Sequence, residues 1–221
     1  MDLKNGIFID LGHGGHDSGA LGLKYSESML VLDIGKELNL LLEESGLKYQ
    51  FSRLSDIYLT LDKRCELANK MKADIFISIH INSAKDTSVA GTESWVYSLN
   101  NNKTSVDFAT SITNELSDVL EINNRGVKEN SRFRVLNGTT MGAIIIEVDF
   151  ISNPNREQAI KDNIKVIAKT IYINILKFYE MQDSIEERLY KVNIGAFKNK
   201  ENAVKLKNEA IAKGFKDTYI I

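Results

Sequence analysis

The chain has 221 residues, of which 43% are hydrophobic, and its formal charge at pH 7 is −2. This size and hydrophobic content suffice for one well-buried core with a small appendage. No stretch of the sequence approaches the ~20 apolar residues that a membrane-spanning helix needs, so we expect no membrane insertion. Cys65 is the only cysteine, which excludes a disulfide framework and a zinc site built from cysteines. Its place in an apolar helical stripe favours a structural role over a nucleophilic one.

Strand-like and helix-like segments alternate along residues 1–180, which we assign to one domain. Short, mostly apolar runs predict strands at residues 7–11, 75–79 and 143–146, and residues 49–53, 93–97 and 133–136 are predicted as further strands. Apolar residues at helical spacing predict helices at residues 30–42, 59–71, 104–120 and 160–178, and Pro154 marks a helix start. This alternation predicts an α/β fold, a mostly parallel twisted sheet of about six strands with helices on both faces.

The C-terminal region differs from the rest of the chain. Residues 181–188 are polar and charge-rich, as a linker would be, and residues 189–221 predict one small β-α-β unit. Such a unit is too small to bury a core by itself, and its last apolar strand would leave an exposed sheet edge. We therefore expect that a second copy of the chain completes it in a homodimer, or that the natural sequence continues.

Charge is distributed unevenly between these two regions. Residues 188–221 carry eight Lys and Arg against three Asp and Glu, a local charge of +5, which leaves −7 for residues 1–187. A basic tail on an acidic body is typical of proteins that bind an anionic partner, such as nucleic acid or a wall polymer. A solvated helix face explains the same charges equally well.

Three short segments carry metal-competent side chains at the ends of apolar runs. They are a glycine-rich loop with His13, a Ser-Ile-His-Ile-Asn segment with His80, and an Ile-Glu-Val-Asp-Phe segment with Glu147. The carboxyl ends of parallel strands meet at one rim of a sheet, where α/β proteins keep their sites. With Glu27 the set contains two imidazoles and two carboxylates. That suffices for a catalytic zinc, which takes three protein ligands and leaves a position for water.

Several of these features have more than one interpretation. His16 lies three residues after His13 and could reach the same metal, or it could be a loop residue only. The loop glycines could suggest a phosphate site, but no Lys-Ser/Thr follows them and their spacing is not Gly-x-Gly-x-x-Gly. Glu147 follows an apolar run at residues 143–146, so we expect poor solvation to raise its pKa and to suit it to proton transfer.

Taken together, residues 6–179 resemble the Amidase_3 family of zinc-dependent N-acetylmuramoyl-L-alanine amidases, which occur in bacterial cell-wall hydrolases and phage endolysins. The matching segments follow one another in the family's order. They are the loop at residues 10–20, Glu27, Ser52-Arg53 with Asp56, Leu61 with Arg64, Ala68-Asn69, and the segments at residues 78–82, 91–93, 125–128 and 147–153.

The resemblance implies a function and assigns roles to the candidate residues. It implies zinc held by His13, Glu27 and His80, with Glu147 as the catalytic carboxylate. The reaction would be hydrolysis of the amide between N-acetylmuramic acid and L-alanine, with peptidoglycan and not nucleic acid as the partner. Two alternatives are a zinc peptidase or carboxypeptidase that acts on stem peptides, and a non-catalytic amidase-like protein that binds the wall.

The C-terminal unit, residues 189–221, resembles a different known module. It resembles the first half of a SPOR domain, a wall-binding module that recognises glycan strands lacking stem peptides. The matching positions are Tyr190, Val192, Gly195-Ala196-Phe197, Asn202-Ala203, Leu206 and Gly214-Phe215.

The N-terminus has no pattern of a secretory signal peptide. After Lys4 the first apolar run, at residues 7–11, ends at once in Gly12 and His13. We therefore expect synthesis in the cytoplasm and access to the wall after lysis of a phage host or a sporulating mother cell.

Overall fold

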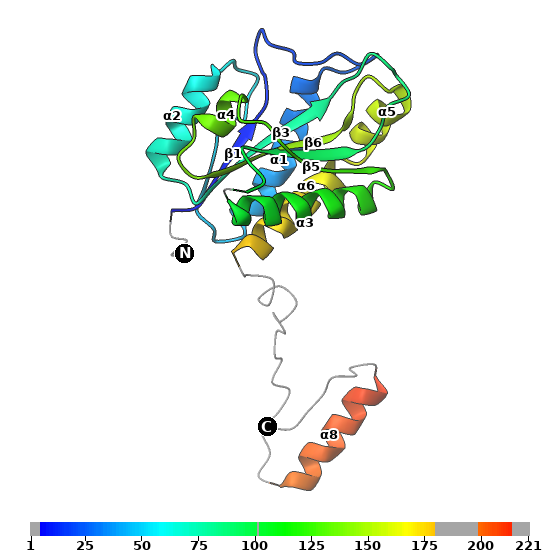
Figure 1. Ribbon diagram of the computed structural model, residues 1–221. Coiled ribbons are helices and arrows are strands. Elements are labelled where there is room, and N and C mark those ends of the chain that lie inside the picture. Colours follow the sequence, from blue (N-terminus) through cyan, green and yellow to red (C-terminus); the bar gives the residue numbers. More distant parts are fainter. Residues whose placement is uncertain (1–4, 101, 180–198, 214–221) are drawn as a thin grey trace. The chain divides into compact units, whose positions relative to one another are not determined.

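A six-stranded sheet forms the centre of the fold (Figure 1), and the computed structural model describes residues 5–100, 102–179 and 199–213. The strands lie in the order β2 (Tyr49–Phe51), β1 (Ile7–Leu11), β3 (Ile75–Asn82), β6 (Gly142–Phe150), β4 (Thr92–Val96) and β5 (Asn124–Glu129). Every neighbouring pair is parallel except β4 and β6, which are antiparallel. The predicted mostly parallel sheet of about six strands is confirmed.

Helices cover both faces of the sheet, as the alternating pattern predicts. One face carries α1 (Glu27–Glu43), α3 (Lys103–Val119) and α6 (Ile164–Phe178), and the other carries α2 (Leu61–Met71) and α4 (Arg134–Asn137). A further helix, α5 (Pro154–Asp162), follows β6.

The core divides according to the two-residue period of the strands. Ile7, Ile77 and Ile144 pack toward α1, α3 and α6, whereas Phe8 and Phe76 pack toward α2 and α4. Successive side chains of a strand point to opposite faces, so this division decides where later residues of each strand lie. His80 on β3 and Glu147 on β6 share the face of Phe76 and Ile145, beyond the part that α2 and α4 cover.

Cys65 lies inside the smaller of these two clusters. It is buried on α2, and its thiol donates to the carbonyl of Arg134 on α4 at 3.6 Å. Burial raises the pKa of the thiol, which keeps it protonated near neutral pH. Its surroundings therefore match the predicted structural role.

One predicted strand is wrong. Residues 133–136 form no strand, because Phe133 is the N-cap of the short helix α4, whose Val135 and Leu136 are buried against α2. The segment Phe133-Arg134-Val135-Leu136 is too short for its apolar residues to separate a strand from a helical turn. The fifth strand is instead β5, a polar edge strand, and it lacks the buried apolar run that predicts central strands.

Other boundaries differ from the prediction in ways that matter for function. β3 and β6 continue past their apolar runs, so His80 and Glu147 lie within paired strands and not after them. The helix predicted at residues 160–178 is divided at Asn163 into α5 and α6. The Asn163 side chain donates to the carbonyl of Ala159, which ends α5.

The chain separates into two compact units, Met1–Gln182 and Asp183–Ile221. In the second unit the structure describes one helix, α8 (Lys200–Ala212), at the place where the sequence predicts a helix. The predicted linker at residues 181–188 and both predicted strands of the C-terminal unit lie outside the described residues.

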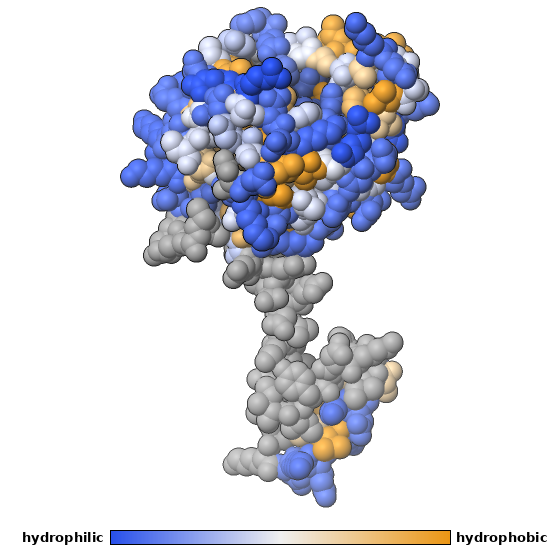
Figure 2. All heavy atoms as spheres, viewed as in Figure 1, coloured by the Kyte–Doolittle hydropathy of each residue, from blue (hydrophilic) through white to orange (hydrophobic). Residues whose placement is uncertain are grey.

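The face in Figure 2 is mostly hydrophilic, and its apolar residues form separate small patches. Among the described residues, no helix combines the length and the hydropathy that crossing a bilayer requires.

Glu157 on α5 holds the loop that leads into α1. Its carboxylate accepts hydrogen bonds from the backbone amides of Leu23, Lys24 and Tyr25 at 3.0, 2.8 and 2.7 Å. The residue is only 2% exposed. The first residue of α1, Glu27, comes two positions after Tyr25, so this anchor sets the start of the helix.

Replacing Glu157 with Gln should lower the free energy of unfolding by about 1–3 kcal/mol, because an amide oxygen cannot satisfy three amide donors. Burial alone would raise the pKa of Glu157, but the three backbone hydrogen bonds outweigh it and hold the pKa below its usual value. The anchor therefore stabilises the fold above pH ~4.3 and is lost as pH falls through the lower, folded-state pKa. Urea titrations at several pH values should show a smaller acid-induced loss in Glu157→Gln than in the wild type. Glu44→Gln, at an exposed carboxylate beyond α1, is the control, and equal stability of all three proteins would contradict the prediction.

Candidate metal centre

His13 follows β1 at a sharp reversal of the backbone. Its φ of 58° lies in the left-handed region, which few residues other than glycine adopt without support. Two arginines provide that support. Arg64 donates to the carbonyls of Leu11 and His13 at 2.6 and 2.8 Å, and Arg53 donates to the carbonyl of Gly12 at 2.8 Å.

Glu27 is the first residue of α1 and is 4% exposed. Helix formation begins here because the Ser26 side chain accepts the amide of Met29 as an N-cap. The Glu27 carboxylate accepts the backbone amides of Ala20 and Ile81 at 2.9 and 3.1 Å. A carboxylate at a helix N-terminus is also favoured by the helix dipole.

The two predicted histidines converge on this carboxylate. His80 Nδ1 lies 2.8 Å from Glu27 Oε1, and His13 Nε2 lies 3.2 Å from Glu27 Oε2. One ligand atom from each of the three residues falls within 4.8 Å of the others. Among the described residues this is the one group of three or more His, Cys, Asp or Glu that could hold a metal ion.

Two glycines of the loop give the ligating side chains their space. A Cβ on Gly12 would lie 2.4 Å from the His80 ring, and a Cβ on Gly19 would lie 2.6 Å from both Glu27 Oε2 and the His13 ring. The close approach of the three side chains therefore explains why Gly12 and Gly19 are glycines. A phosphate site is not needed to explain them.

Glu27 and the two histidines shift one another's pKa values. Burial alone would raise the pKa of Glu27, but hydrogen bonds to both histidines outweigh it and lower that pKa. Burial alone would lower the histidine pKa values. The hydrogen bonds and charge of Glu27 outweigh it, raising the pKa of His13 and bringing that of His80 to about 9. The buried carboxylate therefore favours the protonated form of each imidazole.

Asp17 orients His13 and is a residue that the sequence analysis did not single out. Its Oδ2 lies 2.9 Å from His13 Nδ1, and its Oδ1 accepts the amide of Gly19 at 3.1 Å. A carboxylate that binds one ring nitrogen places the proton there and leaves the other nitrogen free to ligate. The signal in the sequence is an acid four residues after His13, within the same loop.

Glu147 lies on β6 beside the metal-competent group. It is in register with His80 on β3, and among the described residues its buried Oε2 has no hydrogen-bond partner. Burial raises its pKa to about 7, as the apolar run before it predicts. A carboxyl group with this pKa can both accept and donate a proton near neutral pH.

The structure keeps His16 out of the metal-competent group, and it gives Asp149 structural contacts. His16 is exposed and its ring packs against Tyr58, with ring centroids 4.0 Å apart. Asp149 is buried and binds the amide of Gly91 and the side chain of Arg156, as a structural residue would.

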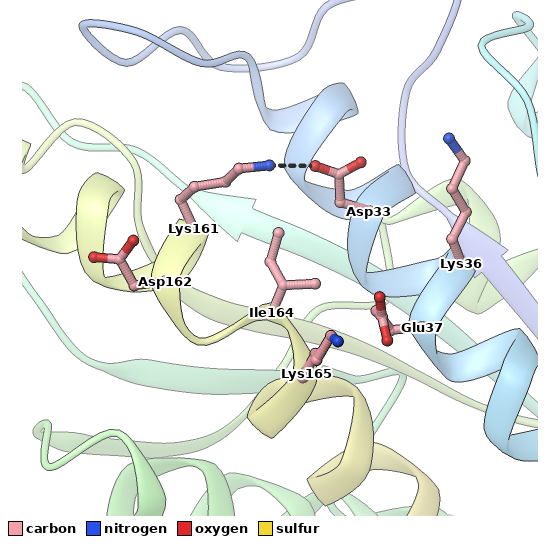
Figure 3. A pocket seen from close by; sticks show the side chains of 7 residues that line it. All are labelled: Asp33, Lys36, Glu37, Lys161, Asp162, Ile164 and Lys165. Carbon is pink, nitrogen blue, oxygen red and sulfur yellow. Dashed lines mark hydrogen bonds and ion pairs between the residues drawn. The ribbon is translucent and has the colours of Figure 1, made fainter.

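A separate hollow lies between α1 and the ends of α5 and α6 and shares no residue with the centre (Figure 3). It is lined by Asp33, Lys36, Glu37, Lys161, Asp162, Ile164 and Lys165. Lys161 donates to Asp33 at 2.7 Å and its ammonium lies over the Tyr25 ring. These contacts join α5 to α1 and help to seat the loop before Glu27.

Known proteins share both the sequence and the fold. A family model described as N-acetylmuramoyl-L-alanine amidase, Amidase_3, matches residues 7–177. The chain is 36% identical to the sporulation-specific N-acetylmuramoyl-L-alanine amidase of Bacillus subtilis (strain 168), over 95% of this chain and 82% of that protein. It is 35% identical, with the same coverage, to the N-acetylmuramoyl-L-alanine amidase CwlM of Bacillus licheniformis.

A solved structure agrees with these sequence relatives. The N-acetylmuramoyl-L-alanine amidase from Clostridium difficile 630 superposes with a TM-score of 0.73 at 32% identity, over 79% of this chain and 96% of that one. Residues 7–177, which the family model matches, include β1 to β6, α1 to α5 and all but the last residue of α6. The chain therefore belongs to the Amidase_3 family of N-acetylmuramoyl-L-alanine amidases, enzymes that hydrolyse the peptidoglycan of the cell wall.

Proposed function

We propose that this amidase works with zinc held by His13, Glu27 and His80, and with Glu147 as the catalytic base and acid. The bond cut is the amide between the lactyl group of N-acetylmuramic acid and L-alanine. One observation carries the proposal: three ligating side chains converge beside a buried carboxylate oxygen that has no partner among the described residues.

The residues present fit a zinc ion. Imidazole nitrogens and a carboxylate oxygen are ligands that zinc prefers, and three of them leave a position open for catalysis. The buried charge of Glu27 and the raised pKa values of both histidines support a cation at this place. When bound, zinc supplies a Lewis acid that acidifies water and polarises a carbonyl.

The protein's own groups would carry out the proton transfers and hold the geometry. Glu147, with a pKa near 7, would take a proton from the attacking water and pass it to the leaving amine of L-alanine. Asp17 would keep the proton of His13 on Nδ1, and the amides of Ala20 and Ile81 would keep the Glu27 carboxylate in place.

The products of a peptidoglycan digest should identify the bond. We expect free stem peptides that begin with L-alanine, together with glycan that keeps its lactyl groups, as measured by mass spectrometry of purified walls. Fragments cut between amino acids would indicate a zinc peptidase. A wall that is bound but not cut would indicate a non-catalytic wall-binding protein.

The three ligands can be tested with a matched histidine control. His13→Ala and His80→Ala should each lose most of the ~1 zinc per chain expected of the wild type, because two protein ligands hold the ion poorly. His16→Ala should retain zinc, since His16 lies against Tyr58 and outside the group. Metal analysis of purified proteins measures this, and loss of zinc from His16→Ala alone would contradict the assignment. A chelator should abolish hydrolysis, and added zinc should restore it.

Glu147→Gln should lower the rate of peptidoglycan hydrolysis by about 10²–10⁴-fold, the usual range for loss of a general acid and base. Zinc content should stay near the wild-type value, since Glu147 is not one of the three proposed ligands. Release of peptides from dyed or labelled walls measures the rate. Glu66→Gln, at an exposed carboxylate on α2, should keep full activity. Wild-type activity of Glu147→Gln would remove Glu147 from the mechanism.

A further inference from the structure

A row of charged side chains crosses the sheet from the metal centre toward its β5 edge. Glu147 on β6 is in register with His80 on one side and with Glu93 on the other, so the three share one face. Beyond Glu93 lie two cations of β5, Arg125 and Lys128, which we call the basic pair. Each donates to Glu93 Oε2, at 2.7 and 2.6 Å.

An irregularity in β5 places both cations on this face. Residues three apart on a regular strand point to opposite sides, yet Arg125 and Lys128 reach the same carboxylate oxygen. The register of β4 with β5 shifts after Thr92, and Gly126 has a φ of 78°. This is the geometry of a bulge with a left-handed glycine, a device that re-aims side chains beside functional sites.

The basic pair carries more charge than its partner balances. Glu93 is 3% exposed and supplies one negative charge to two cations, which leaves a net charge of +1. Burial alone would raise the pKa of Glu93, but the hydrogen bonds of the pair outweigh it and keep the carboxylate ionised. Asn82 also donates to Glu93, at 3.1 Å. Glu93 therefore cannot neutralise the pair.

Both cations are held in place and open to solvent. The Arg125 guanidinium lies over the Phe150 ring at 5.0 Å, and the Lys128 ammonium lies over the Trp95 ring at 5.2 Å. Their side chains are 31% and 35% exposed. Among the described residues, the terminal nitrogens of Arg125 have no recorded hydrogen-bond partner, which leaves a planar donor group for a carboxylate.

We propose that the basic pair binds a carboxylate of the stem peptide, and specifically the free α-carboxylate of its second residue, D-glutamate. This rests on the proposed function, since it takes the scissile amide to lie beside Glu147. The glycan strands consist of neutral sugars, so the anionic groups of the substrate lie on the peptide side of the cut bond. D-glutamate continues the stem through its γ-carboxyl, which leaves the α-carboxylate free.

The spacing suits this substrate. Neighbouring strands lie ~4.8 Å apart, so β5 lies ~10 Å from β6 and its Glu147. One extended residue spans ~3.5 Å, so a carboxylate borne by the residue after L-alanine falls between Glu147 and the basic pair. The head groups of Arg125 and Lys128 already reach back to Glu93 on β4, the strand next to β6.

Two soluble substrates that differ in one group test the proposal. One is N-acetylmuramoyl-L-alanyl-γ-D-glutamyl-L-lysine, and the other carries D-isoglutamine, in which the α-carboxylate is an amide. The wild type should cleave the acid with a kcat/KM about ten-fold or more above that of the amide, because a charged hydrogen bond is lost in the amide. The C-terminal carboxylate of lysine is present in both and cancels from the ratio.

Variants of Arg125 and Lys128 then test whether the basic pair causes the preference for the acid over the amide substrate. Arg125→Gln and Lys128→Gln should each lower the acid-to-amide ratio toward one, whereas Arg125→Lys should keep most of it because the charge remains. Lys103→Gln, at an 85% exposed cation on α3, should keep the wild-type ratio. A purely structural role of the pair would change stability and total activity but not this ratio.

Two results would overturn the proposal. Equal cleavage of both tripeptides by the wild type would exclude recognition of the α-carboxylate while leaving the amidase function intact, and this measurement needs no variant to fold. An undiminished ratio in folded Arg125→Gln and Lys128→Gln would assign the preference to other residues. Cleavage of neither tripeptide at the muramoyl amide would contradict the proposed function, and this proposal with it.

Discussion

The buried carboxylate of Glu27 is the constraint on which the rest of the site depends. A negative charge that is 4% exposed is costly unless positive charge and hydrogen bonds surround it. In this fold two imidazoles and two backbone amides surround the Glu27 carboxylate, and Gly12 and Gly19 leave space for the ligating side chains. Because these groups come from the glycine loop, α1 and β3, the centre forms only when segments far apart in the sequence have come together.

The antiparallel pairing of β4 with β6 determines which charged residues lie beside this centre. It places Glu93 directly beside Glu147, so that the Glu147 carboxyl group is flanked by His80 on one side and by an acid on the other. Both burial and the charge of Glu93 raise the pKa of Glu147. Arg125 and Lys128 keep Glu93 ionised and extend the row to the sheet edge. The proposed proton transfer and the proposed peptide recognition thus use one line of residues across four strands, β3, β6, β4 and β5.

Much of this could be predicted from residue patterns, and the failures have physical causes. The buried strands β1, β3 and β6 have strong apolar runs, whereas β5 is a polar edge strand whose position is set by pairing with β4. Val135 and Leu136 are apolar because α4 packs on α2, and a segment of four residues is too short to show a period. The role of Asp17 was not predicted, because it depends on a turn that brings the Asp17 carboxylate back to His13.

The sequence by itself determined the α/β class, the chemistry of the donor set and the apolar setting of Glu147, because strand periodicity and residue type are local properties. Only the tertiary structure decided which side chains meet. The approach of His13, Glu27 and His80 to within 4.8 Å needs the loop reversal that Arg53 and Arg64 hold. The meeting of Arg125 and Lys128 at Glu93 needs a bulge and a register shift. Such contacts depend on pairing between distant segments, which no local pattern encodes.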